Sequence, residues 1–344
     1  MERNRRGKGK VKKVFKVIGN VLLAICIVLI LAGIIGTIIN KRITEKKMAE
    51  YEEYYGEFYD TTQGRINYTV VGAGDQTIVL LPGLGSSTPH YEFTELASYL
   101  SEDYKVIIVE PLGYGLSDDT DEERSPENIC NEIHEVLSGI GEEQYYLMCH
   151  SISGLYALKY CNLYEDEVLG FVGIDASVPA QIQDENAEVQ ALFTKIMKIC
   201  LIDTGIYRII NANVAEMPDE FYMNPEYKGT PVHALQFLSP EEREAFIQIT
   251  LGRNANDTVI AELKHIKESC ESQMNDTFPK SIPVLYMLAE DTIETTPNWV
   301  RYHEDLSCNN EASKVITMEG SHYLHLCDAD ELAETFEIWV NNAK

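Results

Sequence analysis

The feature that most limits how this chain can fold is an uncharged stretch of 24 residues near its N-terminus, residues 17–40. The stretch is rich in Ile, Leu and Val, and as an α-helix rising about 1.5 Å per residue it would cross the roughly 30 Å hydrocarbon layer of a membrane. It is longer than the apolar core of a signal peptide, and no A-x-A cleavage site precedes Lys41. The pattern therefore predicts one transmembrane helix over residues 17–40, followed by a polar helical stalk over residues 41–57.

Charge differs sharply on the two sides of this stretch. Residues 1–16 hold eight of the 28 basic residues and a single acid, so the rest of the chain carries 20 basic against 54 acidic residues. Because basic segments stay in the cytoplasm, residues 1–16 are predicted to be a cytoplasmic tail of a single-pass protein of the cell membrane, with the acidic body extracytoplasmic. Four basic residues on the far side weaken this signal: Lys41, Arg42, Lys46 and Lys47. A body this acidic repels phosphate groups, so nucleic acid is not an expected partner.

Beyond the stalk, continuous apolar segments alternate with helical ones. Such strands, separated by helices, predict an α/β fold: a mostly parallel sheet covered by helices on both faces. The expected strands are residues 58–62, 65–71, 77–81, 105–109, 145–148, 168–174, 283–288 and 314–318. The alternation is interrupted at residues 177–280, which show helical patterns and no convincing strand. A block of that length predicts a helical lid, which leaves residues 58–176 and 281–344 as the core.

Residues 144–164 combine a short apolar strand, a turn of small and polar residues, and a helix that begins near Gly154. A sharp strand-to-helix turn of this kind holds its central residue, here Ser151, in a strained conformation and requires small residues two positions before and after it. Cys149 and Ser153 meet that requirement, although the usual G-x-S-x-G pattern has glycines there. The alternative interpretation is an ordinary strand followed by a helix that Ser151 or Ser153 caps.

Three polar residues follow predicted strands in the order serine, acid, histidine: Ser151, Asp291 and His322. Together with the turns around them, they make residues 58–340 resemble a lid-bearing α/β hydrolase of the membrane-anchored bacterial type. The matching segments are Leu81-Pro82-Gly83-Leu84-Gly85, residues 110–118 (EPLGYGLSD), residues 149–154 (CHSISG), Ile282-Pro283-Val284-Leu285 and Gly320-Ser321-His322.

The resemblance implies acyl transfer to water through an acyl-serine. Ser151 would be the nucleophile, His322 its base and Asp291 the carboxylate that orients the histidine. The backbone amides of Leu84 and Ile152 would stabilise the oxyanion. The spacing before Asp291 is one residue short of the usual pattern, so Glu290 and Asp175 remain alternatives for the acid.

Other histidines are weaker candidates for the base. His150 occupies the variable position of the turn, where a structural role is expected, and His325 is expected to face the lid or solvent. The remaining five lie on predicted helices or in the lid, where surface or packing roles are expected: His90, His134, His233, His265 and His303.

No cofactor or metal is expected. The run Gly83-Leu84-Gly85 begins like a dinucleotide-binding turn, but Thr88 stands at the third glycine position, and neither an H-E-x-x-H motif nor a cysteine cluster occurs. Outside the cell a disulfide between Cys200 and Cys270 is one interpretation, and buried thiols are the other.

The sequence therefore favours a serine hydrolase of small-molecule acyl substrates, in the simplest case a carboxylesterase. An aminopeptidase of the same fold is an alternative that would need an acidic group for a substrate amine, from Glu110 or a glutamate of the lid. A non-catalytic surface receptor that retained the fold is a third.

Overall fold

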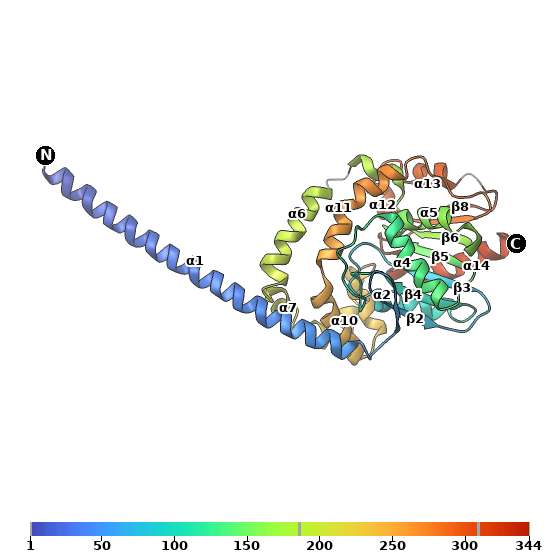
Figure 1. The fold of residues 1–344 in the computed structure, drawn as a ribbon, viewed down its shortest axis with the longest axis horizontal. Coiled ribbons are helices and arrows are strands. Elements are labelled where there is room, and N and C mark those ends of the chain that lie inside the picture. Colours follow the sequence, from blue (N-terminus) through green and yellow to red (C-terminus); the bar gives the residue numbers. More distant parts are fainter. Residues whose placement is uncertain (1, 185–186, 308–309, 344) are drawn as a thin grey trace.

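A computed structural model describes residues 2–184, 187–307 and 310–343, and its centre is a mixed sheet of eight strands (Figure 1). The strand order is β1-β2-β4-β3-β5-β6-β7-β8; β2 pairs antiparallel with β1 and β4, and all later pairings are parallel. The strands are β1 (Glu57–Asp60), β2 (Arg65–Val71), β3 (Thr77–Leu81), β4 (Lys105–Glu110), β5 (Tyr145–His150), β6 (Val168–Ile174), β7 (Val284–Ala289) and β8 (Lys314–Met318). The predicted mostly parallel sheet is confirmed.

Helices cover both faces of this sheet. The helices of the core are α2 (Pro89–Glu92), α3 (Thr94–Leu100), α4 (Pro126–Gly139), α5 (Ser153–Leu163), α12 (Glu290–Thr295), α13 (Trp299–Ser307) and α14 (Ala329–Ala343). Alternate residues of each strand enter opposite layers: Val79 and Leu147 pack with α4 and α5, whereas Ile78 and Met148 pack with α3 and α14. This period of two, with both sides apolar, is why the strands read as continuous apolar runs.

A helical insertion, residues 177–283, separates β6 from β7. Its α-helices are α6 (Ala187–Met197), α7 (Ile206–Ile210), α8 (Asp219–Tyr222), α9 (Pro231–Ala234), α10 (Pro240–Arg253) and α11 (Asp257–Ser272), and a π-helical turn, Lys198–Ile202, joins α6 to α7. Short 3₁₀ turns link the helices from α7 to α10. In the described part of the insertion no strand occurs, which agrees with the helical pattern of its sequence.

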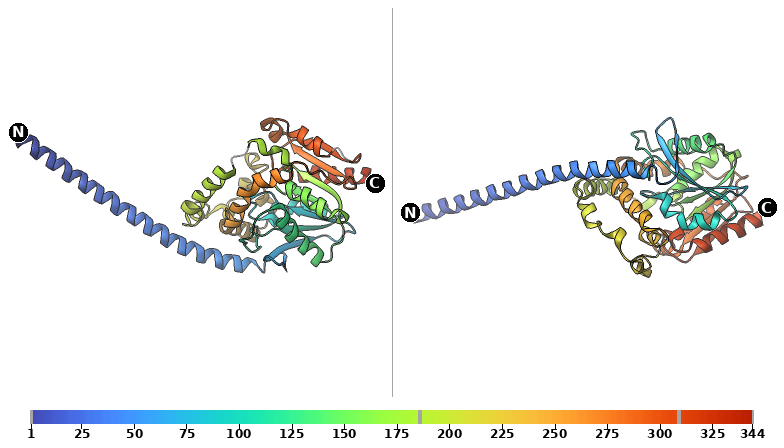
Figure 2. Two further views of the ribbon diagram at one scale, coloured as in Figure 1. Left: turned by 45° about the horizontal axis from the view of Figure 1, so that its top comes forward. Right: turned by 90° about the horizontal axis from the view of Figure 1, so that it is seen from below.

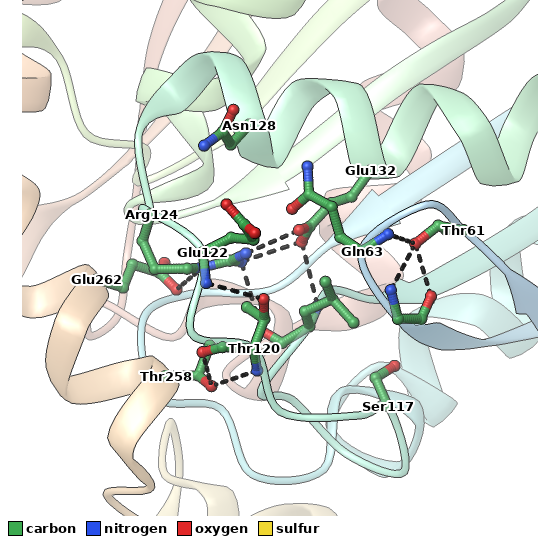
Figure 3. Close-up of polar contacts among 12 residues, drawn as sticks. Thr61, Gln63, Ser117, Thr120, Glu122, Arg124, Asn128, Glu132, Thr258 and Glu262 are labelled. Carbon is green, nitrogen blue, oxygen red and sulfur yellow. Dashed lines mark hydrogen bonds and ion pairs between the residues drawn. The ribbon is translucent and has the colours of Figure 1, made fainter.

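The insertion is joined to the core by a buried charged cluster (Figure 3). Arg124 donates two hydrogen bonds to Glu132 on α4, at 2.7 and 3.0 Å, and its Nε lies 4.0 Å from Glu262 on α11. Glu262 also accepts hydrogen bonds from the hydroxyls of Tyr114 (2.8 Å) and Tyr156 (2.7 Å). All three charged side chains are at most 1% exposed, so each depends on its partners to offset the loss of water.

The N-terminal helix α1 runs without interruption from Glu2 to Tyr51, so the expected span and stalk are one element. It is long and apolar enough to cross a membrane. Its C-terminal part packs on the insertion. Arg208 of α7 donates to the side chains of Asn40 (2.8 Å) and Thr44 (3.0 Å), and Asn40 donates to the carbonyl of Ile202 (2.9 Å). The stalk is therefore held against the body.

Candidate active site

Ser151 stands at the sharp turn between β5 and α5, as the sequence predicts. Its φ of 53° lies in the left-handed region, which a residue with a side chain adopts only when its surroundings enforce it. The turn is held against the end of β6, because the amide of Ser151 donates to Ile174 (3.2 Å) and that of Ser177 donates to the carbonyl of Ser151 (2.7 Å). This backbone directs the hydroxyl toward the carboxyl edge of the sheet.

His322 lies directly against this serine. Its Nε2 is 2.8 Å from Ser151 Oγ, and its Nδ1 is 2.7 Å from Asp175 Oδ2. An ionised carboxylate can only accept, so Nδ1 carries a proton and donates to Asp175. In the neutral ring Nε2 is then the free acceptor, which leaves it able to take the proton of Ser151.

Asp175 follows β6 directly and is completely buried. Its Oδ1 accepts from the Ala289 amide (3.1 Å) and Trp299 Nε1 (2.9 Å), and its Oδ2 accepts from Thr292 (2.5 Å) as well as His322. Burial by itself would raise the pKa of this carboxyl, but the hydrogen bond and electrostatic interaction with His322 and the hydrogen bonds from Thr292 and Trp299 outweigh it and lower the pKa. Asp175 therefore stays ionised at neutral pH.

The expectation that Asp291 orients the histidine is wrong for this structure. Strand β7 ends at Ala289 and helix α12 begins at once, so both Glu290 and Asp291 lie exposed in its first turn. The amide of Asp291 donates to the carbonyl of Gly320 (3.2 Å), while its carboxylate makes no described contact with His322. The carboxylate that contacts His322 is instead Asp175, one strand earlier, which the sequence had offered only as an alternative.

The backbone amides expected to stabilise an oxyanion belong to loops that lie close to Ser151. Leu84 follows β3 and Ile152 follows Ser151; neither amide donates to a protein acceptor among the residues that the structure describes. Gly83 permits the close approach of these two loops, because a Cβ there would lie 2.5 Å from His150 Nδ1 and 3.1 Å from Ser151 Cβ. The glycine run after β3 therefore has a steric reason.

The two histidines beside the site are structural. His150 donates from Nε2 to the carbonyl of His322 (3.0 Å), which ties the turn to the loop that carries the base. His325 packs on His150 and Phe93 and is almost fully buried, so the expectation that it faces the lid or solvent is wrong. Burial lowers the pKa of both rings, to about 3 for His325.

A cavity of about 460 Å³, the inner cavity, lies between the core and the insertion. On the core side it is bounded by Gly85, Ser86 and Tyr323, which follow Leu84 and His322 closely in the chain. The insertion supplies a mostly apolar lining: Tyr207, Val214, Phe221, Val232, Leu235, Phe246 and Ile247. The inner cavity, which borders the chain neighbours of Leu84 and His322, is thus suited to an apolar group.

One carboxylate lines this cavity, and it is not the one expected. Glu92 of α2 borders the inner cavity, and burial raises its pKa to about 7. Glu110 instead lies buried at the end of β4, where its carboxylate accepts from Leu116 N (2.7 Å), Tyr55 (3.1 Å) and His90 N (3.3 Å). Glu110 therefore supports the turn after β4 and does not face the cavity.

The described residues contain no cluster of three or more His, Cys, Asp or Glu side chains that could hold a metal ion. The disulfide considered between Cys200 and Cys270 is not formed, since Cys200 is exposed on the π-helical turn and Cys270 is buried on α11.

Comparison with known proteins agrees with this geometry: the protein has the α/β-hydrolase fold. Residues 76–198 match the sequence model described as alpha/beta hydrolase fold. Over 330 residues the chain is 24% identical to the uncharacterized protein YbdG of Bacillus subtilis (strain 168), covering 93% of this chain and 96% of that protein. The similarity to YbdG thus extends over the core and includes at least part of the N-terminal helix.

Solved structures share the fold at low sequence identity. A thermophilic esterase from Thermogutta terrifontis superposes with a TM-score of 0.60 at 15% identity, over 84% of this chain and 98% of that chain. The epoxide hydrolase VrEH1 from Vigna radiata gives a TM-score of 0.58 at 14% identity, over 83% and 97%. The fold thus supports a hydrolase without distinguishing between these two activities.

Proposed function

We propose that the protein is a serine hydrolase that cleaves a carboxylic ester through an acyl-Ser151 intermediate. The observation that carries this proposal is the continuous arrangement of Ser151 Oγ, His322 and Asp175, with contacts of 2.8 and 2.7 Å. A serine at the turn, rather than a carboxylate, favours attack on an acyl carbon.

The steps follow from the positions of these atoms. Ser151 Oγ attacks the ester carbonyl while His322 Nε2 takes its proton, and buried Asp175 stabilises the resulting imidazolium. The amides of Leu84 and Ile152 stabilise the oxyanion of the tetrahedral intermediate, by a few kcal/mol for each donor. His322 then protonates the departing alcohol, and a water molecule, deprotonated by the same nitrogen, releases the acid and Ser151.

The first test is labelling of the full-length protein with a fluorophosphonate probe, together with hydrolysis of p-nitrophenyl butyrate. Both signals should be present in the wild type and fall by at least about 1,000-fold in Ser151→Ala and His322→Ala. Ser153→Ala is the matched control, because this neighbouring serine donates to Pro82 and does not contact His322. Activity that survives in Ser151→Ala would refute the assignment.

The aminopeptidase alternative now depends on Glu92. This carboxylate borders the inner cavity, where it would meet the ammonium group of a substrate. Hydrolysis of aminoacyl p-nitroanilides faster than p-nitrophenyl esters, with the preference lost in Glu92→Gln, would favour it. A well-folded wild type that neither reacts with the probe nor turns over either substrate would favour the receptor interpretation.

We also propose that α1 anchors the protein in the cell membrane with its N-terminus in the cytoplasm. The basic tail supports this orientation. The contacts of Asn40 and Thr44 with Arg208 support a helix that stays attached to the mature body. Protease digestion of intact spheroplasts should remove the body and leave the tail protected.

A further inference from the structure

The outer face of the insertion exposes an unusual number of large apolar side chains. We define the outer face as residues 189–210. This segment includes most of α6, the π-helical turn and α7. Ile209, Ile210 and Phe193 are 76%, 68% and 63% exposed. The others that are exposed are Val189, Leu192, Ile196, Met197, Ile199 and Ile206. A contiguous patch of this kind on a soluble surface indicates an interaction site.

The position of α1 indicates what covers this patch. A Cβ at Gly36 would lie 2.5 Å from the carbonyl oxygen of Thr204, and one at Gly33 would lie 3.8 Å from its Cγ2. Gly36 stands four residues before the end of the apolar run at Asn40, about 6 Å along the helix, and Gly33 about 10 Å. Thr204 therefore sits beside a part of α1 that is expected to lie in lipid.

The arrangement of the helices agrees with this position of the outer face relative to α1. In Figures 1 and 2, α6 and α7 form the edge of the body on the side from which α1 leaves it. The outer face thus points toward any membrane that α1 crosses, at the depth of 5–10 Å that interfacial helices reach.

Charge on the outer face also fits a membrane. The segment carries three basic residues, Lys195, Lys198 and Arg208, against one acid, Asp203, whereas the chain after residue 16 has 20 basic and 54 acidic residues. A locally basic, apolar segment on a strongly acidic body is attracted to anionic lipid headgroups while its Ile and Phe side chains enter the acyl layer.

A second cavity lies between the outer face and the inner cavity. This outer cavity, of about 280 Å³, is lined by Phe193, Met197 and Leu201 of the outer face. It shares Tyr207 and Asn254 with the inner cavity, whose core side is lined by Gly85 and Tyr323. The two cavities therefore adjoin at Tyr207 and Asn254, between the outer face and the loops that carry Leu84 and His322.

We infer that the outer face is seated in the lipid layer around α1 and admits long-chain acyl esters from that layer to Ser151. The substrate class rests on the proposed ester hydrolysis; the seating in lipid does not. The occupant is the bilayer itself, because α1 fixes the patch at the depth of the membrane.

The insertion of the outer face into the lipid layer is tested with tryptophan fluorescence of the full-length protein in liposomes. The two native tryptophans, Trp299 and Trp339, are buried, so Ile209→Trp adds an exposed reporter. Phospholipids brominated on the acyl chains should quench this added emission at least twofold. Ile338→Trp on α14, which is 55% exposed at the opposite end of the body, should show no added quenching. Equal signals from the two variants, or crosslinking of the outer face to a second copy of the chain, would overturn the inference.

Substrate access is tested with Ile209→Glu/Ile210→Glu. Hydrolysis of a palmitoyl ester held in the bilayer should fall at least tenfold, while hydrolysis of water-soluble p-nitrophenyl butyrate stays within twofold. Ile338→Glu should change neither. Unchanged palmitoyl ester hydrolysis in the double variant would overturn the access route. A wild type that hydrolyses neither ester would refute the proposed function, and quenching would still decide the seating.

Discussion

The two ends of the helical insertion differ in the kind of side chain that each one buries or exposes. At the inner end, α11 places Glu262 beside Arg124 and Glu132 of the core, and all three charges are buried with partners. At the outer end, α6 and α7 leave Phe193, Ile209 and Ile210 exposed. The contrast teaches that the insertion is attached to the catalytic core by burying charge, and that its free end is built for an apolar environment rather than for water.

The largest effect, a loss of activity, is expected in the core next to the inner end, at the residues proposed for catalysis. Asp175→Asn should lower kcat for p-nitrophenyl butyrate by about 1,000-fold or more, because an amide no longer holds the His322 tautomer or stabilises its cation. Asp291→Asn, with an exposed side chain, should stay within about twofold. The reverse ranking in steady-state kinetics would restore Asp291 as the acid.

The next effect concerns stability and separates the two ends directly. Arg124→Ala leaves Glu132 and Glu262 buried without their cation and should lower the free energy of unfolding by about 3–5 kcal/mol. Lys198→Ala at the outer end removes a partly exposed ion pair with Asp203 and should cost less than about 1 kcal/mol. Denaturant titration in detergent measures both. Similar losses of unfolding free energy in the two variants would mean that the two ends of the insertion do not differ as described.

The smallest effect concerns the cavity between the two ends. Burial raises the pKa of Glu92 from 4.5 to about 7, so the folded protein retains a proton that the unfolded chain loses between these values. This contribution to stability is full below about pH 4.5 and is lost as pH rises to about 7. Glu92→Gln should remove that decline, so the variant should have a higher free energy of unfolding than the wild type at pH 8. Exposed Glu102→Gln is the control, and an unchanged pH profile in Glu92→Gln would contradict the buried, raised pKa.

Much of the core could be predicted because its signals are local. Each parallel strand is buried on both faces and so appears as an apolar run, and β3 was predicted with its observed bounds, residues 77–81. The turn at Ser151 was recognised from small flanking residues, and its positive φ agrees with that reading. His322 follows the last strand, where the expected order places a base, and it lies 2.8 Å from Ser151.

The acid was harder to predict because two neighbouring strands end in carboxylates at the same edge. Asp175 follows β6 and Asp291 follows β7 after one residue. The choice depends on the backbone after each strand: Asp175 adopts a φ of 40°, and its carboxylate reaches His322, whereas α12 starts immediately after β7 and leaves Asp291 exposed. Neither conformation has a short-range sequence signal, since both depend on contacts with distant residues such as Trp299.

By itself, the sequence determined the apolar N-terminal helix and which segments along the chain become strands. It also determined the strained serine and the histidine that follows the last strand. Each of these features depends on residues that are close together in the chain. Only the tertiary structure decided that Asp175 holds His322, that Glu92 rather than Glu110 faces the cavity, and that α1 packs on the insertion. These outcomes depend on side chains that meet across long separations, such as Arg208 with Asn40, and no local pattern encodes such a meeting.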